Sequence, residues 1–321
     1  MTHKVVVIGT GFGEQAVAPA YRAAGFEVTV VSPRDSNAVT HAIQAPCDLV
    51  SIHSPPFLHL EHVTLAARHG RAVLCDKPFG RNGQDAWAML ELVEQAKVRH
   101  FLNFEFRCDP LRERVKALLE GGAIGTPLHM NYTMFLSRGR QLPHGWLFQR
   151  EQGGGWIGAF VSHVVDMLHW WFGDVESLSC CSRIDWPQHR GRDSGDARLY
   201  KATAEDAVSA WFRLSNGTTV MLDTGFSAAV NLPPQITILG TEGCIRFGQG
   251  PGLELQRAGA EPEEIPVAME GNPVAVSLQR WFSQVGEAIK NDQQIAPDFN
   301  TGLSCARVLD QLRRADVSLI R

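Results

Sequence analysis

Short apolar runs alternate with helical patterns over the first 122 residues of the chain. The apolar runs are rich in β-branched residues, as in strands buried on both faces of a sheet, and they cover residues 5–8, 28–31, 48–52, 72–75 and 101–104. Apolar residues at helical spacing fill the intervals, over residues 14–24, 58–69, 84–98 and 111–119. This alternation predicts a parallel, doubly wound α/β sheet.

Longer strand-like runs dominate after Gly125, over residues 128–135, 178–184, 207–214 and 218–227. Asn216-Gly217 between the last two runs is a strong hairpin signal, and a second hairpin is expected from residues 235–239 and 244–247. These runs predict an α+β second domain with an open-faced, mainly antiparallel sheet.

Three helices are expected in this second half, over residues 161–172, 277–289 and 301–320. Two polar stretches, 185–201 and 248–272, are predicted to be surface loops. We place one domain at residues 1–122 and the other at 123–321, with the last helix expected to pack back on the first domain.

Composition and charge narrow the class of protein. The 321 residues are 44% hydrophobic and 20% charged, which excludes a disordered chain. Thirty basic against 34 acidic residues give a net charge of −4, with no basic cluster, so a nucleic-acid partner is not expected. The seven cysteines form no CxxC pair, which argues against zinc and a disulfide framework. Without a leader or an apolar spanning segment, a cytoplasmic protein with no membrane partner is predicted.

A glycine-rich turn follows the first predicted strand, at Gly9, Gly11 and Gly13, with Phe12 between them. Such a turn exposes backbone N–H groups at a positive helix end, which suits a pyrophosphate. The usual third glycine position holds Glu14, and Gly13 takes part of its role one place early. An ordinary strand–helix turn is the alternative, but the position in the first βαβ unit favours a Rossmann dinucleotide site.

The tip of the second predicted strand bears on the choice of cofactor. NAD sites place a carboxylate there, whereas this chain has Ser32 and Arg34, which suit a phosphate. We therefore expect NADP. NAD stays possible if Arg34 is solvated and Asp35 serves the ribose.

Motifs that carry a family resemblance occur in order along nearly the whole chain. They are Gly9-Thr10-Gly11-Phe12-Gly13, Ser54-Pro55-Pro56 with His59, Cys75-Asp76-Lys77-Pro78, Asn103-Phe104-Glu105-Phe106-Arg107, Gly153-Gly154-Gly155 before Ser162-His163-Val164-Val165-Asp166, and Asp298-Phe299-Asn300-Thr301-Gly302-Leu303. Through these residues the chain resembles the glucose–fructose oxidoreductase and inositol dehydrogenase family (Gfo/Idh/MocA). The resemblance implies NAD(P)-dependent oxidation or reduction of sugars, cyclitols or related polyols, and a homodimer or homotetramer formed through the C-terminal sheet.

The resemblance also implies catalytic roles. Lys77 follows a parallel strand, where open α/β sheets bind ligands, and would stabilise a developing alkoxide. His163 would take the alcohol proton, and Asp166, three residues on, would orient it. No metal is expected, because His163 and His169 would point roughly 240° apart on one helix. A buried core histidine is the alternative for His163.

Further contacts are softer expectations. The resemblance implies cofactor contacts from Ser54, Pro55, His59 and Asp76 besides Lys77, although the first three also fit a plain helix start. For the substrate we expect Glu105, Arg107, and a stacking wall that includes Trp146 and Trp156, with core packing as the alternative for the aromatics.

Two other functions stay open, one because of a departure from the family pattern and one because of the fold. Many members carry an acid where this chain has Ala159, so a weaker activity is conceivable, as is a non-catalytic NADP-binding sensor. The same fold also hosts cofactor-retaining glycosidases and lyases, which show no net cofactor turnover.

Overall fold

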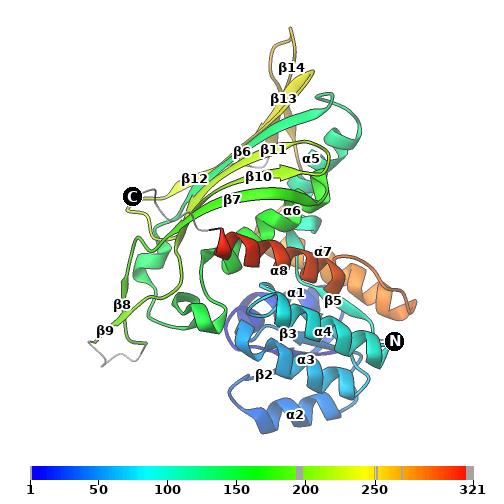
Figure 1. The fold of residues 1–321 in the computed structure, drawn as a ribbon. Helices are drawn as coiled ribbons and strands as arrows, with labels where there is room; N and C mark the ends of the chain where they lie inside the picture. Colours follow the sequence, from blue (N-terminus) through cyan, green and yellow to red (C-terminus); the bar gives the residue numbers. More distant parts are fainter. Residues whose placement is uncertain (1, 193–197, 249, 251, 269, 316–321) are drawn as a thin grey trace. The chain divides into compact units, whose positions relative to one another are not determined.

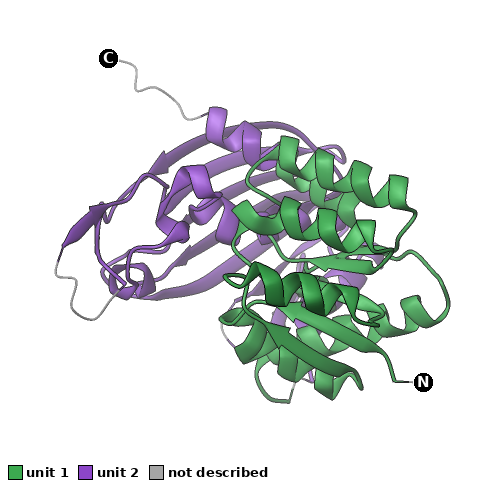
Figure 2. Ribbon diagram, turned by 90° about the horizontal axis from the view of Figure 1, so that it is seen from below, with its two compact units in different colours: residues 1–109, 270–307 green, residues 110–269, 308–321 purple. Residues whose placement is uncertain are grey.

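The computed structural model describes residues 2–192, 198–248, 250, 252–268 and 270–315. The chain forms two compact units (Figure 2). The first contains residues 1–109 and 270–307, and the second contains residues 110–269 and 308–321. The expected division at residue 122 differs from these units, because the helix over residues 110–120 groups with the second unit and the helix over residues 273–290 with the first.

The first unit is built on the predicted five-stranded parallel sheet. Its strands are β1 (Lys4–Ile8), β2 (Glu27–Val31), β3 (Leu49–Ile52), β4 (Ala72–Cys75) and β5 (His100–Leu102). They pair in the order β2-β1-β3-β4-β5, with every pair parallel. The order reverses at β1, so this sheet has the topological switch point at which α/β proteins bind ligands.

Helices connect these strands; all of them except the one between β2 and β3 were predicted. They are a π-turn (Gly13–Val17) that continues into α1 (Ala18–Ala23), then α2 (Ser36–Gln44), α3 (His59–Arg68) and α4 (Gly83–Ala96). The π-turn closes where the amide of Ala18 donates to the Gly13 carbonyl, and Pro19, which lacks an N–H, follows in the first turn of α1. Helix α2 escaped prediction because its buried apolar side is short, only Val39, Ala42 and Ile43.

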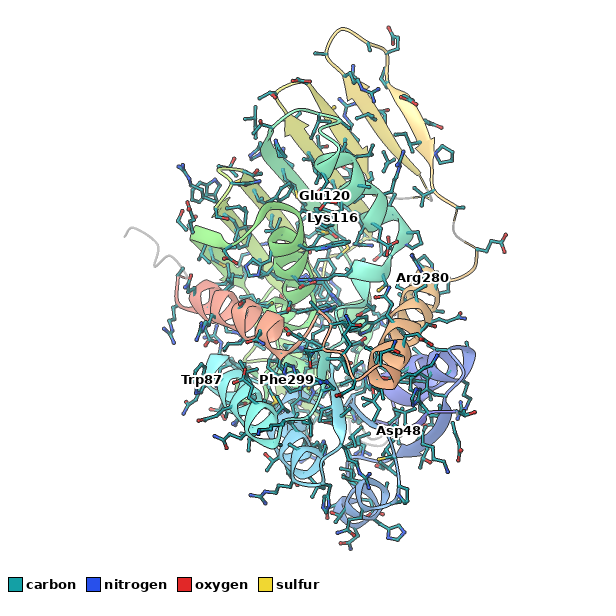
Figure 3. The ribbon with its side chains drawn as sticks, turned by 90° about the vertical axis from the view of Figure 1, so that its right-hand side faces the viewer. Asp48, Trp87, Lys116, Glu120, Arg280 and Phe299 are labelled. Atoms are coloured by element: carbon teal, nitrogen blue, oxygen red, sulfur yellow. The ribbon has the colours of Figure 1, made fainter. Side chains whose placement is uncertain are left out.

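A helix from the end of the chain completes the core of the first unit. On α7 (Pro273–Lys290), Trp281 and Phe282 are fully buried in the same cluster as the strand residues Val5 and Val7. Phe282 stacks on Tyr21 with ring centroids 3.7 Å apart. Arg280 on the same helix (Figure 3) donates to the Cys108 carbonyl at 2.9 Å. Helix α7 therefore belongs to the first unit, although it precedes the last helix of the chain, for which this packing was expected.

The start of α8 (Phe299–Arg314) belongs to the first unit as well. Phe299, labelled in Figure 3, lies with its ring centroid 4.4 Å from that of Phe79 and 5.1 Å from that of His100. Gly302 allows this close approach, since a Cβ there would lie 2.7 Å from the Phe79 ring. Residues 316–320, which were predicted to continue this helix, lie outside the described part of the chain.

The second unit is built on an eight-stranded, mainly antiparallel sheet, as predicted. Its strands are β6 (Pro127–Phe135), β7 (Val175–Arg183), β10 (Ala207–Leu214), β11 (Thr219–Gly225), β12 (Leu232–Gly240), β13 (Gly243–Phe247), β14 (Gly252–Arg257) and β15 (Glu263–Pro266). They pair in the order β15-β14-β13-β12-β6-β11-β10-β7, and only β6 and β11 run parallel. Both predicted hairpins, β10–β11 and β12–β13, are present.

Two helices lie on one face of this sheet (Figure 1): α5 (Pro110–Glu120) and α6 (Ser162–Phe172). Lys116 of α5 joins them, because its Nζ donates to the Trp170 carbonyl of α6 at 3.1 Å. The same Nζ lies 2.8 Å from Oε1 of Glu120 on its own helix (Figure 3).

The two predicted loops are wrong in part. Residues 188–190 and 199–201 pair as the short strands β8 (Gln188–Arg190) and β9 (Leu199–Lys201), and the second predicted loop contains β14 and β15. The glycine, proline and glutamate content of that region hid an alternation in which Leu253 and Leu255 point to the core. Within the described ranges, no helix is both long enough and apolar enough to cross a bilayer.

Candidate active site

Four residues that directly follow parallel strands form a row at the carboxyl edge of the first unit's sheet: Gly9, His53, Asp76 and Asn103. The register sets this row, because Ile8, Ile52, Cys75 and Leu102 are paired neighbours and each of the four comes one residue later. Backbone hydrogen bonds of 2.9, 2.9 and 2.8 Å, from the amides of His53, Asp76 and Asn103, continue the sheet through the row. The three side chains of the row, those of His53, Asp76 and Asn103, are therefore positioned by backbone that continues the sheet.

Glycine is required at two positions of the turn above β1. A Cβ on Gly9, whose φ is +157°, would lie 2.8 Å from the His53 carbonyl oxygen, and a Cβ on Gly13 would meet His53 and Val7 at 3.2 and 3.3 Å. Gly13 is thus the glycine at which the helix approaches the sheet. A Cβ on Gly11 would meet nothing within 4 Å, so this glycine borders open space.

The turn fits a dinucleotide. Phe12, the N-cap of the π-turn, is 42% exposed, and the first amides of the turn follow the open space beside Gly11. Backbone N–H groups at a helix start, next to a position without a side chain, are what a pyrophosphate requires. Gly9, Gly11, Phe12 and Gly13 are the residues of this chain that would hold it.

Two charged residues follow β2: Asp35, whose carboxylate is hydrogen-bonded, and Arg34, whose side chain is exposed. The Asp35 carboxylate accepts the Ala38 amide at 2.9 Å and so caps α2. Arg34 is exposed, and the Ser32 hydroxyl accepts the Arg34 amide at 3.3 Å.

The loop after β3 is held by two buried histidines. His59 Nε2 lies 2.8 Å from the Ser54 carbonyl oxygen, and His62 Nδ1 lies 3.0 Å from the Ser54 hydroxyl. Burial lowers the pKa of His59 to about 4, and burial also lowers the pKa of His62. His59 is 1% exposed, so it acts on the site by fixing the Ser54-Pro55 backbone.

The Asp76 carboxylate is shared by three donors. Oδ2 lies 3.0 Å from His53 Nδ1, and Oδ1 accepts the Lys77 amide at 2.8 Å and Asn103 Nδ2 at 3.3 Å. Burial alone would raise the pKa of Asp76, but the His53 ring, the Lys77 charge and the Lys77 amide hold it well below its ordinary value. Asp76 is therefore an anion that fixes the backbone of the half-buried Lys77.

Sequence reasoning missed His53 and the residues behind it. His53 Nε2 lies 2.8 Å from the Ser51 hydroxyl, which lies 3.0 Å from the Tyr21 hydroxyl, and the side chains of all three are buried. A signal was available: His53 and Asp76 both come one residue after a predicted strand, and the carboxyl ends of parallel strands lie at one edge of a sheet.

In the second unit, the triple glycine packs against its own surroundings. A Cβ on Gly154 would lie 2.2 Å from the Trp146 carbonyl oxygen, and one on Gly155, at φ +104°, would lie 2.2 Å from Glu205 Oε1. The same Glu205 oxygen accepts the Ile157 amide at 3.1 Å. Glu205, another residue missed from sequence, is 4% exposed, and burial raises its pKa. These contacts fix the start of the segment that continues into α6.

Helix α6 carries the expected proton-transfer residues. His163 is 5% exposed and Asp166 is 2% exposed, one helical turn apart. Across the part of the chain that the structure describes, no three His, Cys, Asp or Glu side chains group as a metal site would require.

The expected substrate residues differ in their surroundings. Glu105 is buried and Arg107 half-buried, both in the short turn after β5. Trp156 belongs to the core of the second unit: its ring stacks between Phe160 and Phe226, and its Nε1 donates to Thr224 Oγ1 at 3.0 Å. Trp146 is half-buried, which leaves it as the more accessible of the two tryptophans.

Comparison with known families agrees with both units. Residues 3–104 match the oxidoreductase family with an NAD-binding Rossmann fold, and residues 113–246 match the GFO/IDH/MocA C-terminal domain. The chain belongs to the GFO/IDH/MocA oxidoreductase family. The family resemblance and the fold class inferred from sequence are thereby confirmed, and the protein is an NAD(P)-dependent oxidoreductase of this family.

Several named relatives are dehydrogenases. The chain is 31% identical to an uncharacterized oxidoreductase of Synechocystis sp. over 265 residues, which are 76% of this chain and 71% of the relative. It is 29% identical to the levoglucosan dehydrogenase of Pseudarthrobacter phenanthrenivorans over 230 residues, 67% of this chain and 59% of that enzyme. It is 24% identical to the inositol 2-dehydrogenase of Rhizobium meliloti over 331 residues, 97% of this chain and 89% of that enzyme. The levoglucosan dehydrogenase match thus leaves about two fifths of that enzyme's length unaligned.

Solved structures share the fold. A levoglucosan dehydrogenase in complex with NADH and levoglucosan has a TM-score of 0.86 at 22% identity, covering 98% of this chain and 97% of that one.

Proposed function

We propose that the protein is an NADP(H)-dependent oxidoreductase that interconverts a carbinol and a carbonyl group of a sugar, cyclitol or related polyol. The row Gly9, His53, Asp76 and Asn103, with Lys77 directly after it, carries this proposal, because it combines a dinucleotide cradle with a lysine at one sheet edge. The names of the levoglucosan and inositol dehydrogenases support a polyhydroxylated substrate.

The preference for NADP rests on the tip of β2. Asp35 is engaged as the cap of α2, while Ser32 and the exposed Arg34 follow the end of β2 and could bind a 2′-phosphate there. When bound, the dinucleotide supplies the hydride acceptor or donor. The chain's own part is to hold it through the glycine turn, Ser32 and Arg34, with the Ser54-Pro55 loop shaping the neighbouring edge.

Lys77 is assigned to the substrate oxygen. An ammonium group there donates a hydrogen bond to the hydroxyl and stabilises the negative charge that develops as its proton leaves. Asp76 supports this role by fixing the Lys77 amide. Glu105 and Arg107 follow the next strand and are proposed to contact other hydroxyls of the substrate, with Trp146 stacking on its flat face.

His163 is assigned the role of acid and base for the carbinol proton. Its imidazole accepts the proton of the carbinol during oxidation and returns it during reduction, and Asp166 orients the ring. The absence of an acid at Ala159 leaves Asp166 as the carboxylate proposed for this task.

We further propose a homo-oligomer formed through the second unit's sheet, in a cytoplasmic setting. Met221 on β11 and Leu239 on β12 are 47% and 42% exposed, and we assign both to this interface. Light scattering would report a dimer or tetramer that Met221→Lys with Leu239→Lys dissociates. A monomeric wild type would contradict this assembly.

A panel of sugars and cyclitols, tested with NAD and NADP side by side, is the experiment for the activity. Nicotinamide absorbance that changes with a polyol, faster with NADP, is the expected result. Substrate conversion with no net change in absorbance would instead indicate a cofactor-retaining glycosidase or lyase. Cofactor binding without conversion of any polyol would indicate a sensor.

A further inference from the structure

A buried polar chain lies behind the lysine loop of the first unit. It runs from the Tyr21 hydroxyl through the Ser51 hydroxyl to His53, and from His53 to the Asp76 carboxylate. Every link is 2.8 to 3.0 Å long. The chain ends at the amide of Lys77, which the same carboxylate accepts at 2.8 Å.

Each nitrogen of the His53 ring has its own hydrogen-bond partner. With Nδ1 donating to Asp76, Nε2 accepts from Ser51, whose oxygen in turn accepts from Tyr21. The ring is wholly buried, so water does not replace either partner. Removing it would leave Asp76 Oδ2 without its ring donor in a site that is 8% exposed.

The Asp76 carboxylate can adopt two orientations, and the hydrogen bond from His53 determines which one it adopts. With Oδ2 held by the ring, Oδ1 faces the Lys77 amide and Asn103 Nδ2, and the carboxylate stays in the row. Without the ring, a buried carboxylate turns toward solvent or toward the Lys77 ammonium, since both compensate its charge better than an apolar wall does. Either rotation releases the Lys77 amide.

We propose that His53 is the positioning residue of Lys77, acting through Asp76 to fix the lysine backbone at the edge of the sheet. This rests on the proposed function in so far as Lys77 acts on the substrate. The chain from Tyr21 to His53 holds the ring itself in place, so the rigidity of the sheet core reaches the lysine through side-chain hydrogen bonds.

Two substitutions of His53 separate positioning from packing. His53→Asn keeps a donor close to the position of Nδ1, whereas His53→Leu fills space without one. We expect His53→Leu to lower kcat about tenfold or more while leaving the Kd of NADPH within about threefold, and His53→Asn to stay within about threefold of the wild-type kcat. In an Asp76→Asn background, His53→Leu should lower kcat by less than about twofold more.

His100→Leu is the matched control. His100 is also a buried histidine of this sheet, but it begins β5 and so lies at the opposite edge, where its Nδ1 accepts the Phe299 amide at 3.2 Å. His100→Leu should lower the thermal stability of the protein, but kcat, calculated per chain that binds cofactor, should stay at the wild-type value. An equal fall in kcat for His100→Leu and His53→Leu would overturn the positioning role, as would a wild-type kcat in His53→Leu.

Hydrogen exchange tests the same inference without any activity. The Lys77 amide is protected by Asp76, so the peptide that contains residues 76–80 should exchange faster in His53→Leu, and at the wild-type rate in His53→Asn and His100→Leu. Unchanged exchange in His53→Leu would refute the positioning role. Faster exchange in a protein that converts no polyol would leave the positioning intact and refute the proposed function alone.

Discussion

The Asp35 carboxylate accepts a hydrogen bond from the Ala38 amide at 2.9 Å and so caps helix α2. This contact uses the acid that stands nearest to the tip of β2, where NAD-binding sites place a carboxylate on the ribose hydroxyls. The residue before it, Arg34, is exposed and carries the opposite charge.

Arg34→Ala should therefore weaken the binding of NADPH far more than the binding of NADH. Loss of one charge-assisted contact to a 2′-phosphate corresponds to about a tenfold rise in the Kd of NADPH, with the Kd of NADH within about twofold. Fluorescence titration of both cofactors measures this. Asp35→Asn, which keeps the helix cap, is the control and should leave the ratio of the two affinities unchanged. Equal losses for NADPH and NADH in Arg34→Ala would remove Arg34 from the phosphate site.

The glycine turn allows a matched pair of alanine substitutions. Gly11→Ala adds a methyl group to open space, so the free energy of unfolding should stay within about 1 kcal/mol of the wild-type value. The Kd of either cofactor should rise about tenfold or more, because the methyl group occupies the space proposed for the pyrophosphate. Gly9→Ala meets the His53 carbonyl oxygen at 2.8 Å and should cost about 2 kcal/mol or more of stability. Urea unfolding and cofactor titration on the same samples separate the two effects. A Gly11→Ala protein with unchanged cofactor affinity would contradict the cradle.

His59 makes stability fall in mild acid. Its folded-state pKa, about 4, is below the unfolded value of 6.5, so the unfolded chain binds the extra proton first and the stability present at neutral pH is lost as pH falls from about 6.5 toward 4. Between pH 7 and pH 5 this amounts to about 2 kcal/mol. His59→Gln keeps a donor for the Ser54 carbonyl but does not titrate, and it should lose about 2 kcal/mol less than wild type over that interval, by urea unfolding at each pH. Parallel pH curves for the two proteins would show that His59 is not the group responsible.

Lys77→Met should abolish polyol turnover while leaving the Kd of NADPH within about threefold, because the proposed role of the ammonium group is to stabilise charge on the substrate oxygen, and the glycine turn, Ser32 and Arg34 provide most of the proposed cofactor contacts. Single-turnover kinetics with saturating cofactor measures the chemical step directly. Lys97→Met, on the exposed end of α4, is a control that should retain full activity. Retained turnover in Lys77→Met would remove this residue from the mechanism.

Periodicity and glycine placement were enough to predict most of the fold. The five parallel strands, the two hairpins and the helix that carries His163 each have an uninterrupted pattern or an Asn-Gly signal of their own. Helix α2 and strand β14 were missed because short apolar sides were masked by polar, glycine and proline residues around them. Assigning α7 to the first unit depends on which cluster Trp281 and Phe282 join, which only tertiary packing decides.

Sequence motifs name some residues of the candidate site, whereas others are brought to it by the pairing of neighbouring strands. Gly9, Lys77 and His163 stand in recognisable motifs. His53 does not, and its importance follows from β3 and β4 being neighbours whose paired ends, Ile52 and Cys75, bring His53 beside Asp76. Glu205 is similar: its contact with Gly155 joins segments 50 residues apart, and no local pattern encodes it.

Cofactor titration tests the central claim most directly. Adding NADPH to the wild-type protein should give saturable binding of one molecule per chain, tighter than NADH, and Gly11→Ala should weaken it with no loss of folded protein. If neither NADPH nor NADH binds to a correctly folded wild-type chain, the first unit does not hold a nicotinamide dinucleotide and the proposed chemistry is wrong.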